Sequence, residues 1–302
     1  MRWTFDNIPE QSGRTAIVTG ANAGIGYAAA RALAMKGARV IMACRNRERG
    51  EAAVARVAAE QPAGSVELAI IDLASLESVR AFADSFEANG SGVDNGRLDL
   101  LVNNAGVMIP PQSKTADGFE LQIGVNFLGH FALTGLLLDV LARTDDSRVV
   151  TLSSLAHRGG RIDFDSFWGA RHYKPWREYQ QSKLACLMFA LELQQRLHAR
   201  GFQVSSLAAH PGGTKTDLQR HNRALMWAMS LLGMSADQGA LPTLFAATEP
   251  RARGGEYIGP HGIYEIRGYP TAAKIAARAR DTEMSRRLWD VAEKHTGVRY
   301  LS

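Results

Sequence analysis

The sequence predicts an α/β protein built on a doubly wound parallel sheet with helices on both faces. Apolar runs of about half a dozen residues recur along the chain, and longer segments with helical spacing lie between them. Nearly continuous apolar runs are typical of parallel strands, which are buried on both faces and joined by crossover helices. The chain has 302 residues, of which 46% are hydrophobic, and this is enough for one such domain with a full core.

About seven strands and seven helices are expected in alternation. The expected strands are residues 15–19, 38–43, 66–71, 98–103, 148–152 and 203–208, with a weaker seventh at 256–259. The expected helices are residues 24–36, 46–60, 75–88, 117–142, 177–200 and 236–248, and a last one at 271–295. No linker rich in Pro, Gly or Ser interrupts this alternation, so residues 1–302 are predicted to form a single domain.

Two long segments fit neither a strand nor a helix. Residues 157–176 form a polar and aromatic connection, which we expect to be an active-site loop. Residues 211–234 begin with a Pro-Gly turn and end in an apolar stretch, which we expect to be a substrate lid. An ordinary packing helix, an oligomer contact and a membrane-surface contact remain alternatives for the apolar part, residues 224–234.

Composition limits the classes of function. The 35 Lys and Arg residues against 30 Asp and Glu give a charge of +5, and no basic run suggests a nucleic-acid partner. Cys44 and Cys186 cannot make a disulfide framework, which fits a reducing cytoplasm. No signal-peptide core and no run of ~20 apolar residues is present, so an integral membrane segment is not expected. The histidines form no pattern typical of a metal site, so none is predicted.

A glycine-rich turn follows the first expected strand. The sequence reads Gly20-x-x-x-Gly24-x-Gly26 and leads into an alanine-rich helix, with Asn22 and Ile25 inside the turn. Glycine allows a tight turn and lets a pyrophosphate approach the N–H groups at the helix N-terminus. The spacing differs from G-x-G-x-x-G, and a purely structural turn is the alternative. The strand and helix on either side favour a nucleotide site.

The next strand ends indicate which nucleotide is bound. Many NAD-binding proteins place an acidic residue after the second strand, but this chain has Arg45 there, whose donor fork suits a 2′-phosphate. NADP(H) is therefore preferred over NAD(H), with an ordinary surface arginine as the alternative. Asp72 follows the third strand and could bind the adenine amino group or cap a helix. The fourth strand is followed by Asn104, Ala105 and Gly106 at the same sheet edge.

A candidate reacting group follows the fifth strand. Ser153 and Ser154 end this strand, and Tyr179 and Lys183 lie four residues apart on one face of an expected helix. The lysine cation is expected to lower the pKa of the phenol, so that Tyr179 exchanges a proton with an alcohol or carbonyl oxygen. Ser154 would hold that oxygen by a hydrogen bond. An exposed helix face is the alternative for the Tyr-x-x-x-Lys pattern.

In combination, these motifs resemble the short-chain dehydrogenase/reductase family over roughly residues 14–300. The resemblance implies a Rossmann-type fold and hydride transfer between a nicotinamide and a carbonyl or alcohol. Tyr179 matches the family's catalytic acid/base, Lys183 the residue that lowers its pKa and holds the nicotinamide ribose, and Ser154 the oxygen-binding serine. Asn126 matches the asparagine that anchors a water molecule in the proton relay.

The resemblance also implies cofactor contacts and assembly. Its cofactor-binding positions include Asp72 with the neighbouring Leu73, Asn104, and the segment with Pro211, Gly212, Thr214 and Thr216. Family members commonly form homodimers or homotetramers through the helices that carry Asn126 and Tyr179, so a homo-oligomer is expected, with a small-molecule substrate.

Three features are similar to retinol dehydrogenases and protochlorophyllide reductases: residues 43–46, residues 153–157 and the 25-residue interval between Ser154 and Tyr179. This similarity implies NADPH and a medium to bulky apolar substrate. A reductase of C=C bonds and a noncatalytic NADP(H)-binding redox sensor remain the alternatives.

Overall fold

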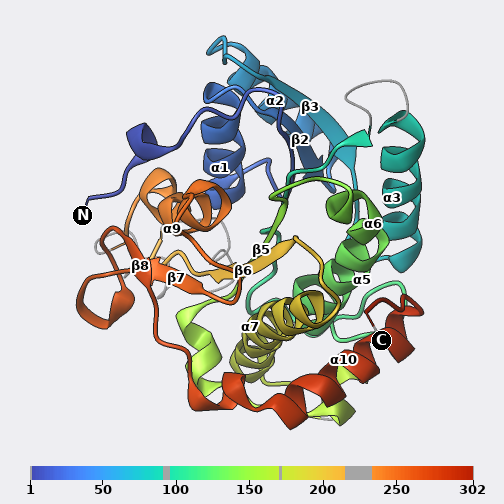
Figure 1. The fold of residues 1–302 in the computed structure, drawn as a ribbon. Coiled ribbons are helices and arrows are strands. Elements are labelled where there is room, and N and C mark those ends of the chain that lie inside the picture. The colour runs from blue at the N-terminus through green and yellow to red at the C-terminus, as the bar shows by residue number, and fades with distance from the viewer. Residues whose placement is uncertain (1, 91–95, 170–171, 215–232, 302) are drawn as a thin grey trace.

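The protein is described by a computed structural model for residues 2–90, 96–169, 172–214 and 233–301. These residues form one eight-stranded sheet in the order β3-β2-β1-β4-β5-β6-β7-β8 (Figure 1). Every neighbouring pair is parallel except β7 and β8. The strands are β1 Thr15–Thr19, β2 Arg39–Cys44, β3 Ser65–Ile70, β4 Leu100–Asn103, β5 Arg148–Leu152, β6 Ser205–Ala209, β7 Tyr257–Pro260 and β8 Pro270–Ala272. The predicted Rossmann-type α/β fold is confirmed, with one strand more than expected.

Two layers of helices cover the sheet (Figure 1). Helices α1 Gly24–Met35, α2 Arg47–Ala58 and α9 Ala236–Thr248 bury alanine-rich and leucine-rich faces in one core. Helices α3 Leu76–Gly90, α5 Gly129–Leu136 and α7 Pro175–Ala199 form the other layer, and α10 Thr282–Thr296 packs outside α7. No helix in the described part of the chain is both long and apolar enough to span a membrane.

The strand order places a crevice at the centre of the sheet. Strand β1 pairs with β2 on one side and with β4 on the other, so the chain first runs outward to β3 and then returns across β1. The loops that leave β1 and β4 therefore diverge to opposite faces of the sheet. Ligands of open α/β sheets bind at this point, beyond the carboxyl ends of the strands.

The helix predicted at 117–142 is interrupted. It begins later, as the short α4 Leu121–Ile123, and continues through a π-helical turn over Gly124–Leu128 into α5. Leu137 then leaves helical geometry with a ψ of 1°, and α6 Leu138–Ala142 follows it. A π-helical turn inside an α-helix frequently marks a functional site.

The helix predicted at 271–295 was wrong in its first half. Residues Pro270–Ala272 pair with β7 as the antiparallel edge strand β8, where a proline without an N–H group is tolerated. A short 3₁₀ helix follows at Ala277–Arg280. Helix α10 begins only after Asp281, whose side chain accepts a hydrogen bond from the Met284 N–H.

Candidate active site

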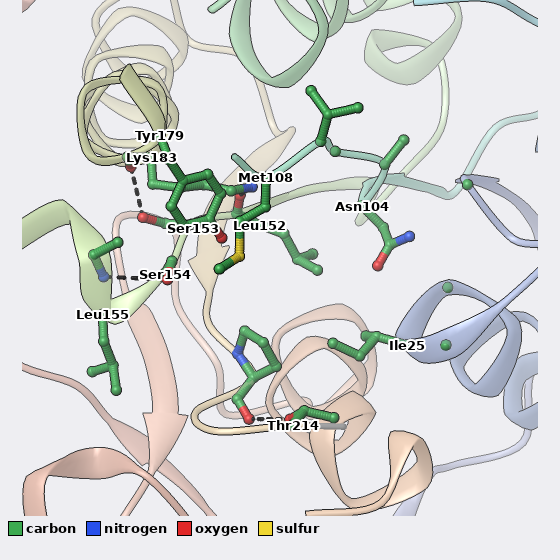
Figure 2. A pocket seen from close by; sticks show the side chains of 18 of the residues that line it. Ile25, Asn104, Met108, Leu152, Ser153, Ser154, Leu155, Tyr179, Lys183 and Thr214 are labelled. Atoms are coloured by element: carbon green, nitrogen blue, oxygen red, sulfur yellow. Dashed lines mark hydrogen bonds between the residues drawn. The ribbon is translucent and has the colours of Figure 1, made fainter. Parts of the chain in front are cut away.

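A cavity of about 720 Å³ opens at the carboxyl ends of the central strands, and Figure 2 shows it from close by. Its walls come from the turns after β1, β2, β4, β5 and β6 and from the first three turns of α7. The structure therefore brings together most residues singled out in the sequence. The predicted site residues that line the cavity are Gly20, Asn22, Gly24, Ile25, Gly26, Arg45, Asn104, Ala105, Gly106, Ser154, Tyr179, Lys183, Pro211, Gly212 and Thr214.

The N-terminus of α1 faces the cavity without a capping side chain. Its N-cap residue is Ala23, which offers no side-chain acceptor, whereas α2, α9 and α10 are each capped by an Asn, Ser or Asp side chain. Gly24, Ile25 and Gly26 of the first turn line the cavity. Uncapped N–H groups and the positive end of the helix dipole fit an anionic group such as a pyrophosphate.

Glycine at position 26 lets two turns pack against each other. A Cβ atom on Gly26 would lie 2.4 Å from Asn104 Nδ2 and 2.5 Å from the Gly20 carbonyl oxygen. Asn104 in turn donates from Nδ2 to the Thr19 carbonyl at 2.7 Å and from its N–H to Thr19 Oγ1 at 2.9 Å. These contacts fix the turn after β4 against the turn after β1, so Asn104 shapes the nucleotide end of the cavity.

Charge in the cavity is entirely positive among the lining residues that the structure describes. Arg45, Arg158 and Lys183 line it, and no Asp or Glu does. Arg45 directly follows Cys44 at the end of β2, is exposed, and makes no ion pair with any described residue. A free guanidinium next to the glycine turn fits a phosphate of the cofactor.

The reacting end of the cavity is formed by α7 and the end of β5 (Figure 2). Tyr179 and Lys183 are each 5% exposed. Lys183 Nζ donates to the Leu152 carbonyl at 3.0 Å, and Ser153 Oγ donates to the Lys183 carbonyl at 2.7 Å. Ser154 Oγ instead accepts the Ala156 N–H at 3.2 Å and interacts with the Tyr179 side chain. Of the two serines, Ser154 is therefore the one that reaches the phenol.

Burial dominates the ionisation of this group. It raises the pKa of Tyr179 to about 12, because a phenolate is poorly solvated there, while the hydrogen bond with Ser154 opposes the rise. Burial also lowers the pKa of Lys183. Loss of solvation is therefore the larger effect on Tyr179 in this structure, and the lowering of its pKa by Lys183 stays a prediction.

Asn126 lies behind the cavity wall and not in it. Its side chain makes two hydrogen bonds with the backbone of Val107. Oδ1 accepts the Val107 N–H at 2.8 Å, and Nδ2 donates to the Val107 carbonyl at 3.0 Å. The backbone carbonyl of Asn126, within the π-helical turn, accepts a hydrogen bond from Cys186 Sγ at 3.1 Å and lies 3.0 Å from His130 Nδ1. Asn126 thus holds Val107, which lines the cavity, and its role in a proton relay stays a prediction.

Three further predicted residues are not among the lining residues. Asp72 Oδ1 accepts the Ala74 N–H at 3.0 Å in the turn before α3, whereas the first N–H groups of α3 are bound by Ser75 Oγ and Asp117 Oδ2, so Asp72 does not cap that helix and its adenine contact stays a prediction. Leu73 is 7% exposed and packs in the core. Thr216 lies outside the described residues, as does most of the predicted lid, residues 215–232. Thr214 is described, and its Oγ1 donates to the Pro211 carbonyl at 2.8 Å.

Sequence reasoning missed the apolar end of the cavity. The side chains that form it are Met108, Pro110, Leu121, Leu155, Ala156 and Trp176. Trp176 is 48% exposed and lies with its ring centre 5.8 Å from that of Tyr179. The sequence contains only a weak indication of this end, because Trp176 is simply the last residue of the active-site loop predicted at 157–176. Arg158 and Gln180 add two polar groups that no motif indicated.

Comparison with known proteins gives matches over most of the chain. Residues 14–226 match the short chain dehydrogenase family. Polyprenol dehydrogenase from Mus musculus is 43% identical over 96% of this chain and 86% of its own length. Retinol dehydrogenase 11 from Homo sapiens is 41% identical over 93% of this chain and 85% of its own length.

Solved structures share the fold. An uncharacterized protein from Mycobacterium paratuberculosis has a TM-score of 0.82 and 42% identity, with 99% of both chains covered. A short chain dehydrogenase from Burkholderia cenocepacia in complex with NADP has a TM-score of 0.64 and 26% identity, covering 82% of this chain and 96% of its own.

Proposed function

Because the chain belongs to the short-chain dehydrogenase/reductase family, whose relatives here include retinol and polyprenol dehydrogenases, we propose that it is an NADP(H)-dependent oxidoreductase for apolar carbonyl or alcohol substrates of medium to bulky size. The family makes it a hydride-transfer enzyme that acts on alcohol or carbonyl groups. One observation carries the finer proposal: the glycine turn, Arg45, the Tyr179 and Ser154 hydroxyls and an apolar wall all face one cavity.

The chain's own residues manage the substrate oxygen and its proton. Tyr179 is the proton donor, because burial keeps its phenol protonated near neutral pH. Ser154 Oγ accepts the Ala156 N–H and hydrogen-bonds the Tyr179 phenol, and its hydroxyl turns to hold the substrate oxygen when substrate is bound. Lys183 supplies positive charge that favours the phenolate left after proton donation. The bound cofactor supplies or accepts the hydride.

The preference for NADP(H) rests on Arg45. This side chain is exposed at the cavity, makes no ion pair with a described residue, and takes the place of the acidic residue that selects the ribose hydroxyl of NAD. The Burkholderia cenocepacia relative with bound NADP supports the same preference.

Substrate size and character follow from the opposite end of the cavity. Met108, Leu121, Leu155 and Trp176 offer apolar contacts in the same cavity as Tyr179, and such a lining suits a carbon chain or ring system more than a small polar alcohol. The names of the retinol and polyprenol relatives support an alcohol as the reacting group.

The proposal extends to assembly and location. The face implied for homodimers or homotetramers is occupied, because residues 129–134 of α5 and 181–190 of α7 are buried within one chain. Trp289 of α10 packs on Phe131 with ring centres 5.0 Å apart, and Tyr300 donates to the Phe131 carbonyl. Homo-oligomers would therefore use a different surface. The two buried, unpaired cysteines are consistent with a reducing cytoplasm.

A paired cofactor titration tests the preference. Arg45→Ala is expected to raise the Kd for NADPH about tenfold, which is typical of a lost charge-assisted hydrogen bond, and to leave the Kd for NADH within about twofold. Arg47→Ala is the matched control, because Arg47 is exposed two residues further along and does not line the cavity. An equal loss for both cofactors in Arg45→Ala contradicts the 2′-phosphate role.

A further inference from the structure

A group of polar side chains beneath the cavity has no part in the proposed chemistry. Glu265 lies between β7 and β8, and its Oε2 accepts hydrogen bonds from Arg158 Nη2 at 2.7 Å and His210 Nε2 at 3.1 Å. Its Oε1 accepts the Lys274 N–H at 3.0 Å. One carboxylate therefore joins three segments that are distant in the sequence.

Two of these segments form parts of the cavity wall. Arg158 follows Ser154 by four residues and lines the cavity itself. His210 directly precedes Pro211 and Gly212, which line another part of the wall. The Gly212 N–H donates to His210 Nδ1 at 3.2 Å, so the imidazole continues the connection into the turn.

The hydrogen bonds of His210 define its protonation. Because Nδ1 accepts the Gly212 N–H, the ring hydrogen resides on Nε2 and points to Glu265. His210 is fully buried, and burial lowers its pKa, whereas the bond from His210 is the main cause that lowers the pKa of Glu265 to about 2. Near neutral pH the imidazole is therefore uncharged and Glu265 is a carboxylate. His210 donates the hydrogen bond between them and Glu265 accepts it.

The backbone around Glu265 is held in a rare conformation. Tyr264 and Glu265 have φ values of 54° and 59°, which residues other than glycine seldom adopt. Such backbone persists where surrounding contacts over-determine it. Two contacts do so here: the Glu265 bonds, and the Gly213 N–H, which donates to the Ile266 carbonyl at 2.7 Å.

A second set of contacts supports the wall that carries Ser154. The His157 Nδ1 atom lies 2.7 Å from the Ser154 carbonyl oxygen, and the Tyr257 hydroxyl donates to the same carbonyl at 3.3 Å. The Tyr257 ring also packs against His210, with ring centres 5.1 Å apart. The backbone of Ser154 and the turn after β6 thus rest on one shared group.

We propose that Glu265 is a positioning residue, which fixes the Ser154 segment relative to the Pro211-Gly212 turn and thereby sets the distance between the substrate oxygen and the reacting face of the cofactor. This inference rests on the proposed function, because the distance affects catalysis only if the cavity binds the cofactor and a substrate as proposed. The connection between the two parts of the wall, by contrast, is a property of the folded chain and can be measured without substrate.

The test compares Glu265→Gln, which keeps the size of the side chain and removes its charge, with Glu67→Gln as the matched control. Glu67 also pairs with an arginine, Arg39, at 2.7 Å, but on β3 at the far end of the sheet from β7. Hydrogen exchange is followed in peptides that cover residues 155–160 and 210–214. Steady-state kinetics with NADPH and 4-deuterated NADPH measure the chemical step.

Glu265→Gln is expected to speed exchange in both peptides and to lower kcat about 10- to 100-fold, with a larger deuterium isotope effect because hydride transfer has become slower. The control is expected to match the wild type. Unchanged exchange in either peptide overturns the connection, and faster exchange with unchanged kcat and isotope effect overturns the positioning role. If Glu265→Gln does not fold, Arg158→Gln is measured in its place, because it leaves the Glu265 backbone and His210 unchanged. The same results are expected, and the same results would overturn the proposal. Absence of turnover in the wild type counts against the proposed function alone, since the exchange measurement still decides the connection.

Discussion

Replacement of Gly26 by alanine tests the packing that forms the nucleotide end of the cavity. The new Cβ would lie 2.4 Å from Asn104 Nδ2 and 2.5 Å from the Gly20 carbonyl oxygen, and the second of these is backbone that cannot rotate away. Overpacking of this kind costs typically about 1–3 kcal/mol. Alanine is better than glycine inside a helix by about 1 kcal/mol. Because both contacts are shorter than 3.0 Å, we take the upper part of the overpacking range, about 2–3 kcal/mol, and expect a net loss of about 1–2 kcal/mol in the free energy of unfolding. NADPH binding is expected to weaken as well, because Asn104 must move.

Urea denaturation and a fluorescence titration with NADPH measure these two effects. Gly106→Ala is a useful comparison, since its Cβ would approach no atom closer than 3.1 Å, and that atom is the side-chain oxygen of Asn126. It is expected to lower the free energy of unfolding by less than about 1 kcal/mol. If Gly26→Ala is as stable as the wild type or more stable, helix propensity outweighs the contacts and the packing argument is refuted.

Two other predictions concern the proton donor and a buried carboxylate. Tyr179→Phe is expected to lower turnover about 10²- to 10⁴-fold, the usual contribution of a general acid, with the NADPH Kd within about twofold of wild type; undiminished turnover removes Tyr179 from the mechanism. Burial raises the pKa of Glu120 from 4.5 to about 7, so the folded state favours the protonated form and the contribution to stability is lost as pH rises between those values. In urea denaturation, the stability of Glu120→Gln relative to wild type is therefore expected to improve by up to about 3 kcal/mol from pH 4.5 to above pH 7; a difference that does not change with pH refutes this.

The parts of the fold that could be predicted from sequence depend on local patterns. Strand β1 could be predicted from its apolar run. The turn after it could be predicted because Gly20 and Gly24 have positive φ values that favour glycine. The cavity could be anticipated because parallel strands end at one edge, so that motifs after β1, β2, β4 and β5 had to meet. Residues 271–276 were misassigned because their alanines favour a helix, whereas pairing of Ala272 with Ile258 decides the outcome.

Contacts between distant segments could not be read in the same way. Glu265 and Arg158 are 107 residues apart, and Glu265 and His210 are 55 apart, so no spacing rule connects them. The raised pKa of Tyr179 has the same origin, because it depends on how completely the folded chain removes water from the phenol. Sequence motifs indicated which groups react, while packing determines how these groups are charged and held.

The central claim is tested most directly by following the transferred atom. The wild-type protein is incubated with 4-deuterated NADPH and an apolar enal, and mass spectrometry and NMR locate deuterium in the product. The account predicts an allylic alcohol with deuterium on the carbinol carbon. Deuterium on the β-carbon of a saturated aldehyde would show reduction of the C=C bond, and tight NADPH binding without deuterium transfer to any apolar aldehyde or ketone would contradict carbonyl reduction by this cavity.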